Sequence, residues 1–398
     1  MFLKVASRSV ATVDNFPDNM QEGMKDISGF CAGICYSDGY DEDSIDEKLS
    51  SIESNIKRHN KVIGTMHHSI SDHPVVTVYL GGISKMMAMI LNSLEFYTTS
   101  ERSARYTKVL AERPEEQELY DKWKDIIYER IKEVYPNIDD KRREKLSMEN
   151  ARYFLSVMNR STSMAYTTSY RQWSYIVQWF DKFIEENKDD KSYFCTSIKD
   201  EMMELSELIL KNGIGTYDIK DTKDRHIRFL QVQTNDPSLE YRESFSDMYL
   251  VRYDCSLACL AQAQRHRTLR YSMNFDGYPK YFFVPEILTD EQKIEWVDDM
   301  RFASKWIPQG TLVHVTESGY IDDFLMKCKE RLCGRAQFEV AMSTADTMNR
   351  LFINGEGNRD LSDCYIRGER LKAKCELVCG GCKEPCEFGA VHALDRSI

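Results

Sequence analysis

Strand-like and helix-like hydrophobic patterns follow one another in the first part of the chain. Val75 to Leu80 carries β-branched residues in alternation, as a half-buried strand does. Two glycines interrupt this pattern before a helical run over Ile83 to Leu94. The apolar spacing and the many charges of Glu115 to Val134 predict a long amphipathic helix. Further helices are predicted over about Glu149 to Met158 and over Tyr170 to Glu186.

The same order of patterns recurs in the second part of the chain. Met248 to Tyr253 predicts a strand, Ser256 to Gln264 predicts a helix, and Tyr320 to Asn349 is long helical sequence. A glycine-containing stretch, Asn212 to Gly215, lies between the two series as a hinge. This repetition suggests a tandem duplication whose copies have diverged far.

The sequence therefore predicts an α+β fold in two similar halves, each with a mixed sheet and long helices. The predicted domains are residues 1–212, residues 213–370 and a cysteine-rich C-terminal tail over residues 371–398.

Composition narrows the class of protein. The 398 residues are 42% hydrophobic and 29% charged, which is enough apolar material for one large core or two modest ones. Lys and Arg total 53 against 64 Asp and Glu, and the net charge of -11 argues against a nucleic acid polymer as a partner. No apolar run approaches the roughly 18 residues that span a bilayer. Residues Met1 to Asp14 lack the pattern of a secretion signal, so we expect a cytoplasmic protein without a membrane partner.

Two polar segments are candidates for chemistry. Gln264 to Arg270 is the densest cationic cluster outside an evident surface helix. Guanidinium groups bind phosphate and stack on rings, which suits an anionic or heteroaromatic ligand, although a solvated helix end is an equal explanation. Thr99 to Tyr106 places Glu101, Ser103 and Arg105 at alternate positions of an extended backbone. This segment suits a polar ligand or a salt-bridged turn.

Together these two segments resemble the signature of a known family, with its two parts in different halves of this chain. In the flavin-dependent thymidylate synthases, Arg-His-Arg ends a helix and a Glu-x-Ser-x-Arg-Tyr loop follows it. Arg265 to Arg267 resembles the first part, and Glu101 to Tyr106 resembles the second. In the first half, Ser93 to Glu95 stands where Arg-His-Arg is expected. In the second half, the loop Met273 to Tyr278 keeps little beyond its tyrosine.

Three first-half segments are similar to the same family. His67 and Ser69 resemble a His-x-Thr/Ser segment whose histidine and hydroxyl approach the flavin. Arg152 resembles an arginine that reaches the nucleotide, and Arg171 resembles an arginine that contacts the flavin.

Two second-half segments add to the resemblance. Gln262 stands at the position of a nucleotide-contacting glutamine. Arg331 to Val340 is similar to a late helix of the form Arg-x-Cys-x-x-Ala-Gln-Trp/Phe-Glu-Ile, whose arginine contacts the nucleotide.

The resemblance implies an FAD-dependent enzyme that methylates dUMP to dTMP with methylene-tetrahydrofolate and NADPH, at sites shared between the halves. It also implies a homodimer that imitates the homotetramer of the family. The implied catalytic residues, which would stabilise enolate-like charge, are Arg105 and Arg152. The implied FAD-binding residues are His67, Ser69, Arg171, Arg265, His266 and Arg267. The implied substrate-binding residues are Glu101, Ser103, Arg105, Arg152, Gln262 and Arg331.

Two other functions and one metal site remain open from the sequence. Altered pockets would favour one-carbon transfer to another pyrimidine nucleotide, giving a hydroxymethylated or cytosine product. A relative whose sites no longer close would be a non-catalytic nucleotide-binding protein. The tail contains four close cysteines, but the two separated pairs of a typical zinc site are absent, so we expect no metal there. These cysteines are Cys375, Cys379, Cys382 and Cys386.

Overall fold

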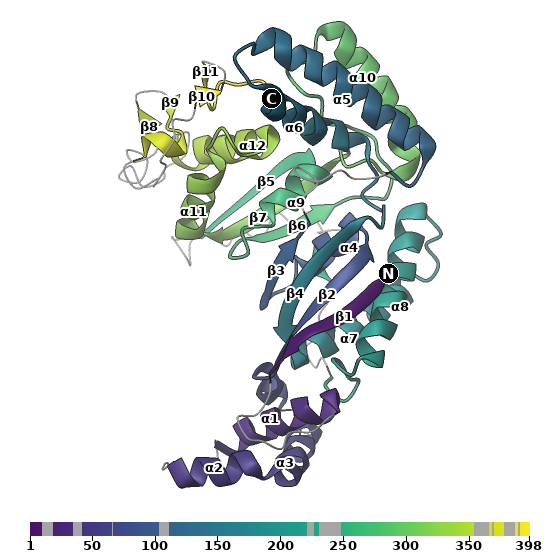
Figure 1. Ribbon diagram of the computed structural model, residues 1–398, viewed down its shortest axis with the longest axis vertical. Helices are drawn as coiled ribbons and strands as arrows, with labels where there is room; N and C mark the ends of the chain where they lie inside the picture. The colour runs from purple at the N-terminus through teal and green to yellow at the C-terminus, as the bar shows by residue number, and fades with distance from the viewer. Residues whose placement is uncertain are drawn as a thin grey trace, which may run out of the picture. The chain divides into compact units, whose positions relative to one another are not determined.

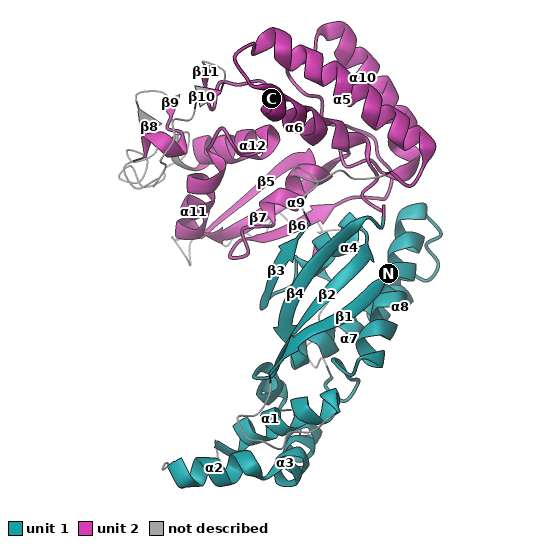
Figure 2. Cartoon of the chain, viewed as in Figure 1, with its two compact units in different colours: residues 1–102, 160–227 teal, residues 103–159, 228–398 magenta. Residues whose placement is uncertain are grey.

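The structure is a computed structural model whose described part forms two compact units (Figure 2). Unit 1 comprises Met1–Arg102 and Arg160–Ile227, and unit 2 comprises Ser103–Asn159 and Arg228–Ile398. All neighbouring strands in the described ranges are antiparallel, so the α+β class is confirmed but the predicted mixed sheet is wrong. The structure describes residues 1–9, 19–34, 42–65, 67–102, 111–220, 227–230, 248–353, 366–367, 370–377, 387–388 and 391–398.

Unit 1 is built on a four-stranded sheet with helices packed against it (Figure 1). The strand order is β1-β2-β4-β3, and Val76, Val78 and Leu80 of β2 are fully buried. This burial explains the alternation seen in the sequence. The strands are β1 Phe2–Arg8, β2 Val75–Ile83, β3 Tyr97–Glu101 and β4 Thr162–Ser169. The helices that follow β2 and β4 are α4 Lys85–Leu91, α7 Tyr170–Glu186 and α8 Tyr193–Lys211.

Three further helices of unit 1 form a small bundle near the 3₁₀ turn η1 (His68–Asp72). Gly29 lets α1 approach α3 closely, because a Cβ atom there would lie 1.8 Å from the backbone oxygen of Asn55. His59 of α3 is buried, and its Nδ1 lies 2.8 Å from the Ser28 hydroxyl of α1. The helices are α1 Met20–Ile34, α2 Glu42–Ser50 and α3 Ile52–Gly64.

Unit 2 repeats the strand order of the unit 1 sheet without its first strand. The order β5-β7-β6 matches β2-β4-β3, and each middle strand is again followed by a helix. The predicted helical run from Tyr320 to Asn349 is wrong in part, because β7 includes Tyr320 and two separate helices follow it. The elements are β5 Met248–Ser256, β6 Arg270–Asn274, β7 Leu312–Tyr320, α9 Leu257–Ala263, α11 Ile321–Arg331 and α12 Phe338–Met348.

A layer of three helices completes unit 2 (Figure 1). Trp123 of α5 contacts Trp296 of α10 edge-on at 4.9 Å and donates a 2.8 Å hydrogen bond to Asp299. This packing places residues 103–159 in unit 2, although the prediction by sequence assigned them to the first half. The helices are α5 Pro114–Val134, α6 Asp140–Ala151 and α10 Asp290–Ala303.

The predicted helix over Glu149 to Met158 is wrong in its second part. Helix α6 ends at Ala151, and a 3₁₀ turn, η2 (Arg152–Phe154), follows it. Beyond that turn the chain pairs with residues 307–310: Val157 N donates to Ile307 O at 3.0 Å, and Gln309 N donates to Leu155 O at 2.8 Å. These tertiary hydrogen bonds replace those of a continued helix.

Short elements complete the described part of the chain. They are η3 Arg228–Leu230, η4 Ser304–Trp306, the π-helical turn η5 Asn349–Ile353, β8 Ile366–Arg367, β9 Arg370–Leu371, η6 Lys374–Glu376, β10 Glu387–Phe388 and β11 Val391–His392.

The equivalent strands β2 and β5 of the two sheets end in the same way. The Ser84 side chain caps α4 by accepting from Met87 N, and Ser84 N donates 2.7 Å to Oε1 of Glu201. The Ser256 side chain caps α9 in the same manner, and Ser256 N donates 2.7 Å to Oε1 of Glu339. Each strand-to-helix turn is thus held by a serine cap and a buried glutamate.

The contact between α1 and α3 gives a first prediction. We expect Gly29→Ala to lower the free energy of unfolding by about 2–3 kcal/mol, because its Cβ would overlap the backbone of Asn55. Gly64→Ala is the matched control, since a Cβ there meets nothing within 4 Å and should change stability by less than about 0.5 kcal/mol. Urea unfolding followed by circular dichroism would measure both. Equal stabilities of the two variants would contradict the close approach.

The buried His59 gives a pH prediction. Burial first, and then the charge of Lys25, lower the pKa of His59 to about 4 from 6.5. Protonation of this ring therefore favours the unfolded chain. The free energy of unfolding has its full value above pH 6.5 and falls by about 3 kcal/mol in total as the pH drops to 4. We expect His59→Gln to reduce the slope of unfolding free energy against pH in that window. A variant with the wild-type slope would show that another group carries the effect.

Candidate functional site

A cluster of buried polar side chains surrounds Arg152 in unit 2, which we call the Arg152 cluster. It contains Arg152, Tyr153, Ser256, Gln337 and Glu339. Tyr153 donates 2.9 Å to Oε2 of Glu339, and the Gln337 amide donates 2.6 Å to the Tyr153 oxygen. Desolvation raises the pKa of Glu339 and, with the neighbouring Glu339 charge, raises the pKa of Tyr153. Three segments distant in sequence therefore meet around one carboxylate.

Arg152 itself is the unusual member of this cluster. Its residue is 5% exposed, yet its Nε and Nη2 atoms have no hydrogen-bond partner in the described part of the chain. The Gln337 Oε1 atom is also buried without a partner there. A buried guanidinium group is stable when an anion or a set of acceptors meets its donors. Arg152 is thus a candidate for binding a polar ligand.

The Arg-His-Arg segment lies directly after α9 and contacts the end of α11. His266 is buried, and its Nε2 accepts a 2.9 Å hydrogen bond from Nε of Arg331. Burial lowers the pKa of His266 to about 3, and the charges of Arg331 and Lys327 act in the same direction. Gln262 offers its backbone oxygen to Arg331 at 3.5 Å, and its side-chain Nε2 is buried without a partner among the described residues.

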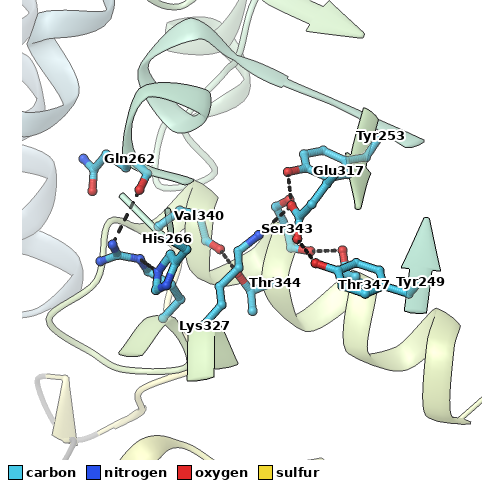
Figure 3. Close-up of polar contacts among 11 residues, drawn as sticks. Tyr249, Tyr253, Gln262, His266, Glu317, Lys327, Val340, Ser343, Thr344 and Thr347 are labelled. Atoms are coloured by element: carbon cyan, nitrogen blue, oxygen red, sulfur yellow. Dashed lines mark hydrogen bonds and ion pairs between the residues drawn. The ribbon is translucent and has the colours of Figure 1, made fainter. Parts of the chain in front are cut away.

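A buried ion pair lies beside this segment (Figure 3). Lys327 Nζ lies 2.7 Å from Oε2 of Glu317, and the two side chains are 1% and 0% exposed. Figure 3 shows Tyr249 and Tyr253 converging on the same carboxylate, to which they donate at 2.7 Å and 2.5 Å. Burial, followed by the Glu317 charge, raises the pKa of both tyrosines. Every oxygen of this carboxylate therefore accepts from at least one donor.

The predicted flavin residues of the first half lie in unit 1. His67 and Ser69 are exposed at η1. Arg171, at the start of α7, donates 2.6 Å to Oδ2 of Asp72 and 3.0 Å to the hydroxyl of Tyr175. Asp72 and Tyr175 thus hold the Arg171 guanidinium, and no motif in the sequence pointed to either residue.

Glu101 is the described member of the predicted Glu-x-Ser-x-Arg loop. It ends β3, and its side chain is buried. It forms an ion pair with Lys85, the first residue of α4, and accepts a 3.3 Å hydrogen bond from Asn92. Ser103 and Arg105 lie outside the described residues.

The units therefore divide the predicted site residues into two groups. Unit 2 contains Arg152, Gln262, Arg265, His266, Arg267 and Arg331, and unit 1 contains His67, Ser69, Glu101 and Arg171. Arg152 joins the second-half residues because α5 and α6 pack in unit 2. Prediction by sequence missed Glu317, Lys327, Glu339 and Tyr153, whose partners are brought together only by the fold. Glu339 alone had a signal, as part of the late-helix motif.

The described residues contain neither a metal-binding cluster nor a membrane-spanning helix. Within the described ranges, no group of three or more His, Cys, Asp or Glu side chains could hold a metal ion. Cys379, Cys382 and Cys386 lie outside those ranges, so the prediction about the tail is not tested. Among the helices that the structure describes, none has the length and apolar character needed to cross a membrane.

The first part of the chain matches a known protein family. Residues 18–182 match the family model described as thymidylate synthase complementing protein. The resemblance predicted from the sequence is thereby confirmed over these residues. They include every predicted site residue from His67 to Arg171, whereas Gln262, Arg265–Arg267 and Arg331 lie beyond the match.

Solved structures resemble the chain only distantly. Two are flavin-dependent thymidylate synthase ThyX from Helicobacter pylori, each with FAD and dUMP, at 16% identity and a TM-score of 0.28. In each case the similarity covers 53% of this chain and 93% of the other chain. At that score the likeness carries no argument about function. No curated protein matches the chain.

The buried ion pair gives a prediction about stability. We expect Lys327→Met to cost about 3–5 kcal/mol, because it leaves the Glu317 carboxylate buried without its counter-charge. The double variant Lys327→Met with Glu317→Gln should cost far less, since one of the two tyrosines can still donate to the amide oxygen and the hydroxyl of the other can accept from the amide NH2. Urea unfolding of the two variants and the wild type measures the difference. Equal losses would mean that packing of the lysine stem, and not charge, dominates.

Proposed function

We propose that the protein is an FAD-dependent enzyme that methylates dUMP to dTMP, with methylene-tetrahydrofolate and reduced nicotinamide as co-substrates. The observation that carries the proposal is Arg152, a buried arginine inside the region matched by the model of the thymidylate synthase complementing protein family, whose Nε and Nη2 meet no partner among the residues that the structure describes. A guanidinium group suits the phosphate or the ring oxygens of a pyrimidine nucleotide. The Gln262 Nε2 atom, which is buried without a partner in the described ranges, supports the same ligand chemistry.

The donor set also suits a flavin dinucleotide. Arg265 and Arg267 are at least partly exposed after α9, and His67 and Ser69 are exposed at η1. Guanidinium and hydroxyl donors fit the diphosphate of FAD. Bound FAD supplies the hydride chemistry that the side chains of the protein lack. The FAD-binding roles of His67, Ser69, Arg171, Arg265 and Arg267 are part of this proposal, while the role of His266 depends on its contact with Arg331.

The chain's own residues then bind and orient the nucleotide. Arg152, together with Arg105, would stabilise the enolate-like charge on the uracil oxygens. Glu101 would fix the sugar or base edge in the orientation set by Lys85 and Asn92. Ser103 would donate a hydrogen bond, while Gln262 and Arg331 would hold the other polar groups of the nucleotide.

We also propose that the chain contains two diverged copies of one fold and forms a homodimer. The shared strand order and the two Ser–Glu turns support this duplication. Ser156 and Pro308 add to the support, because each lies two residues after a 3₁₀ turn (η2 or η4) and they form an antiparallel bridge with each other. Equivalent residues meet in this way across a two-fold axis.

Flavin absorbance and nucleotide titration test the enzyme proposal. The purified protein should bind FAD, and dUMP should shift the flavin spectrum. Arg152→Met preserves the length and apolar stem of the side chain, and we expect it to weaken dUMP binding by about a hundredfold, or ~3 kcal/mol. Arg301→Met is the matched control, because the Arg301 side chain is 70% exposed.

The outcomes separate the candidate functions. The proposal is supported if Arg152→Met loses dUMP binding, Arg301→Met keeps it, and the wild type turns dUMP over in the presence of methylene-tetrahydrofolate. A wild-type protein that binds dUMP but takes up no FAD would instead be a nucleotide-binding relative without this activity. Flavin binding with turnover of a different pyrimidine nucleotide would favour the alternative one-carbon transfer.

A further inference from the structure

The chemistry of the contact between His266 and Arg331 fixes the state of the imidazole. Arginine carries only donors, so the Nε2 atom that meets Arg331 Nε at 2.9 Å must act as an acceptor. The ring is therefore neutral, with its proton on Nδ1. A protonated ring would place two donors against each other. This conclusion follows from donor and acceptor types and does not depend on a titration value.

The surroundings of His266 favour the neutral ring. Its side chain is 8% exposed, and the charged groups facing it are Arg331, Lys327 and Glu330 of α11. The two cations oppose protonation, and the Glu330 carboxylate, at 3.8 Å and with a side chain that is 55% exposed, lies at the water-accessible edge. Lys327 is itself anchored by Glu317, so its charge cannot move away from the histidine.

The hydrogen bond also determines how Arg331 is presented. A guanidinium held through Nε has its plane and direction fixed, and its two terminal nitrogens form the edge at the end of the side chain. The Gln262 backbone oxygen lies 3.5 Å from Nη2, one of these nitrogens, which places the guanidinium against the backbone of Gln262.

We propose that His266 is a positioning residue for nucleotide binding, which acts through Arg331 and does not itself bind the flavin through Nε2. Its acceptor nitrogen fixes the Arg331 guanidinium so that its terminal edge binds the phosphate of a pyrimidine monophosphate. The inference rests on the proposed function and assigns a different role to His266 within it. The middle residue of the Arg-His-Arg segment thus links the two nucleotide-binding elements, α9 and α11.

A pair of substitutions at one position tests this role. His266→Gln keeps a neutral acceptor near the position of Nε2, whereas His266→Leu removes it. We expect His266→Leu to raise the Kd for dUMP at least tenfold and His266→Gln to stay within about threefold of the wild type. The FAD affinity should be the same for both variants and the wild type. A loss of FAD binding in both variants, with dUMP binding unchanged, would overturn the proposal.

Nuclear magnetic resonance of the imidazole tests the same contact without any ligand. The chain contains eight histidines, and the signals absent from His266→Gln identify those of His266 in histidine-labelled protein. We expect a neutral ring with its proton on Nδ1 from pH 8 down to pH 5. Protonation near pH 6.5, or a proton on Nε2, would overturn the contact. If the wild type binds no dUMP, the proposed function fails, while this measurement still decides whether His266 orients Arg331.

Discussion

The buried carboxylate of Glu339 is the interaction on which unit 2 depends. It accepts from the backbone and hydroxyl of Ser256, which ends β5 and caps α9, and from the hydroxyl of Tyr153 in η2. Three elements that are far apart in sequence are therefore fixed by one side chain. The cost of burying this carboxylate is offset by three hydrogen bonds, which also set the position of Arg152 beside Tyr153.

Unit 1 has the same turn with different neighbours. Glu201 holds Ser84 as Glu339 holds Ser256, so the geometry of the strand-to-helix turn is preserved. Glu204, one helical turn further along α8, forms ion pairs with the N-terminal ammonium group and with Arg160. The two units thus share the backbone geometry of the strand-to-helix turn, whereas the side chains around the turn differ between them and can support different ligands.

Three buried polar side chains of unit 2 lie in or beside the segments predicted to bind ligands. Glu317, Lys327 and His266 are almost completely excluded from water, and each has a partner of suitable type. A packed apolar core would be at least as stable as a buried ion pair, so such groups are poor evidence for stability alone. Their value lies in fixing direction, because a hydrogen-bonded side chain in a dry site cannot rotate without losing its partner.

The sequence by itself determined the elements whose hydrophobic pattern is regular within one segment. The 3.6-residue period of Tyr170–Glu186 and the alternation of Val75–Leu80 predicted a helix and a strand, and the structure contains α7 and β2 at those places. The α+β class was also visible in the sequence, as was a resemblance in the first half that the family model over residues 18–182 confirms. Each of these depends on neighbours within a few residues or on a short motif.

Only the tertiary structure decided where the long helical patterns stop. The sequence from Tyr320 to Asn349 is helical in pattern, but Lys374 N donates to Leu332 O and the Arg396 guanidinium donates to Ala336 O. Those carbonyls are satisfied by distant residues, so the helix breaks between α11 and α12. The partners of Glu317 and the burial of Arg152 have the same origin, because a side chain's burial and its hydrogen bonds depend on packing between segments that no local pattern relates.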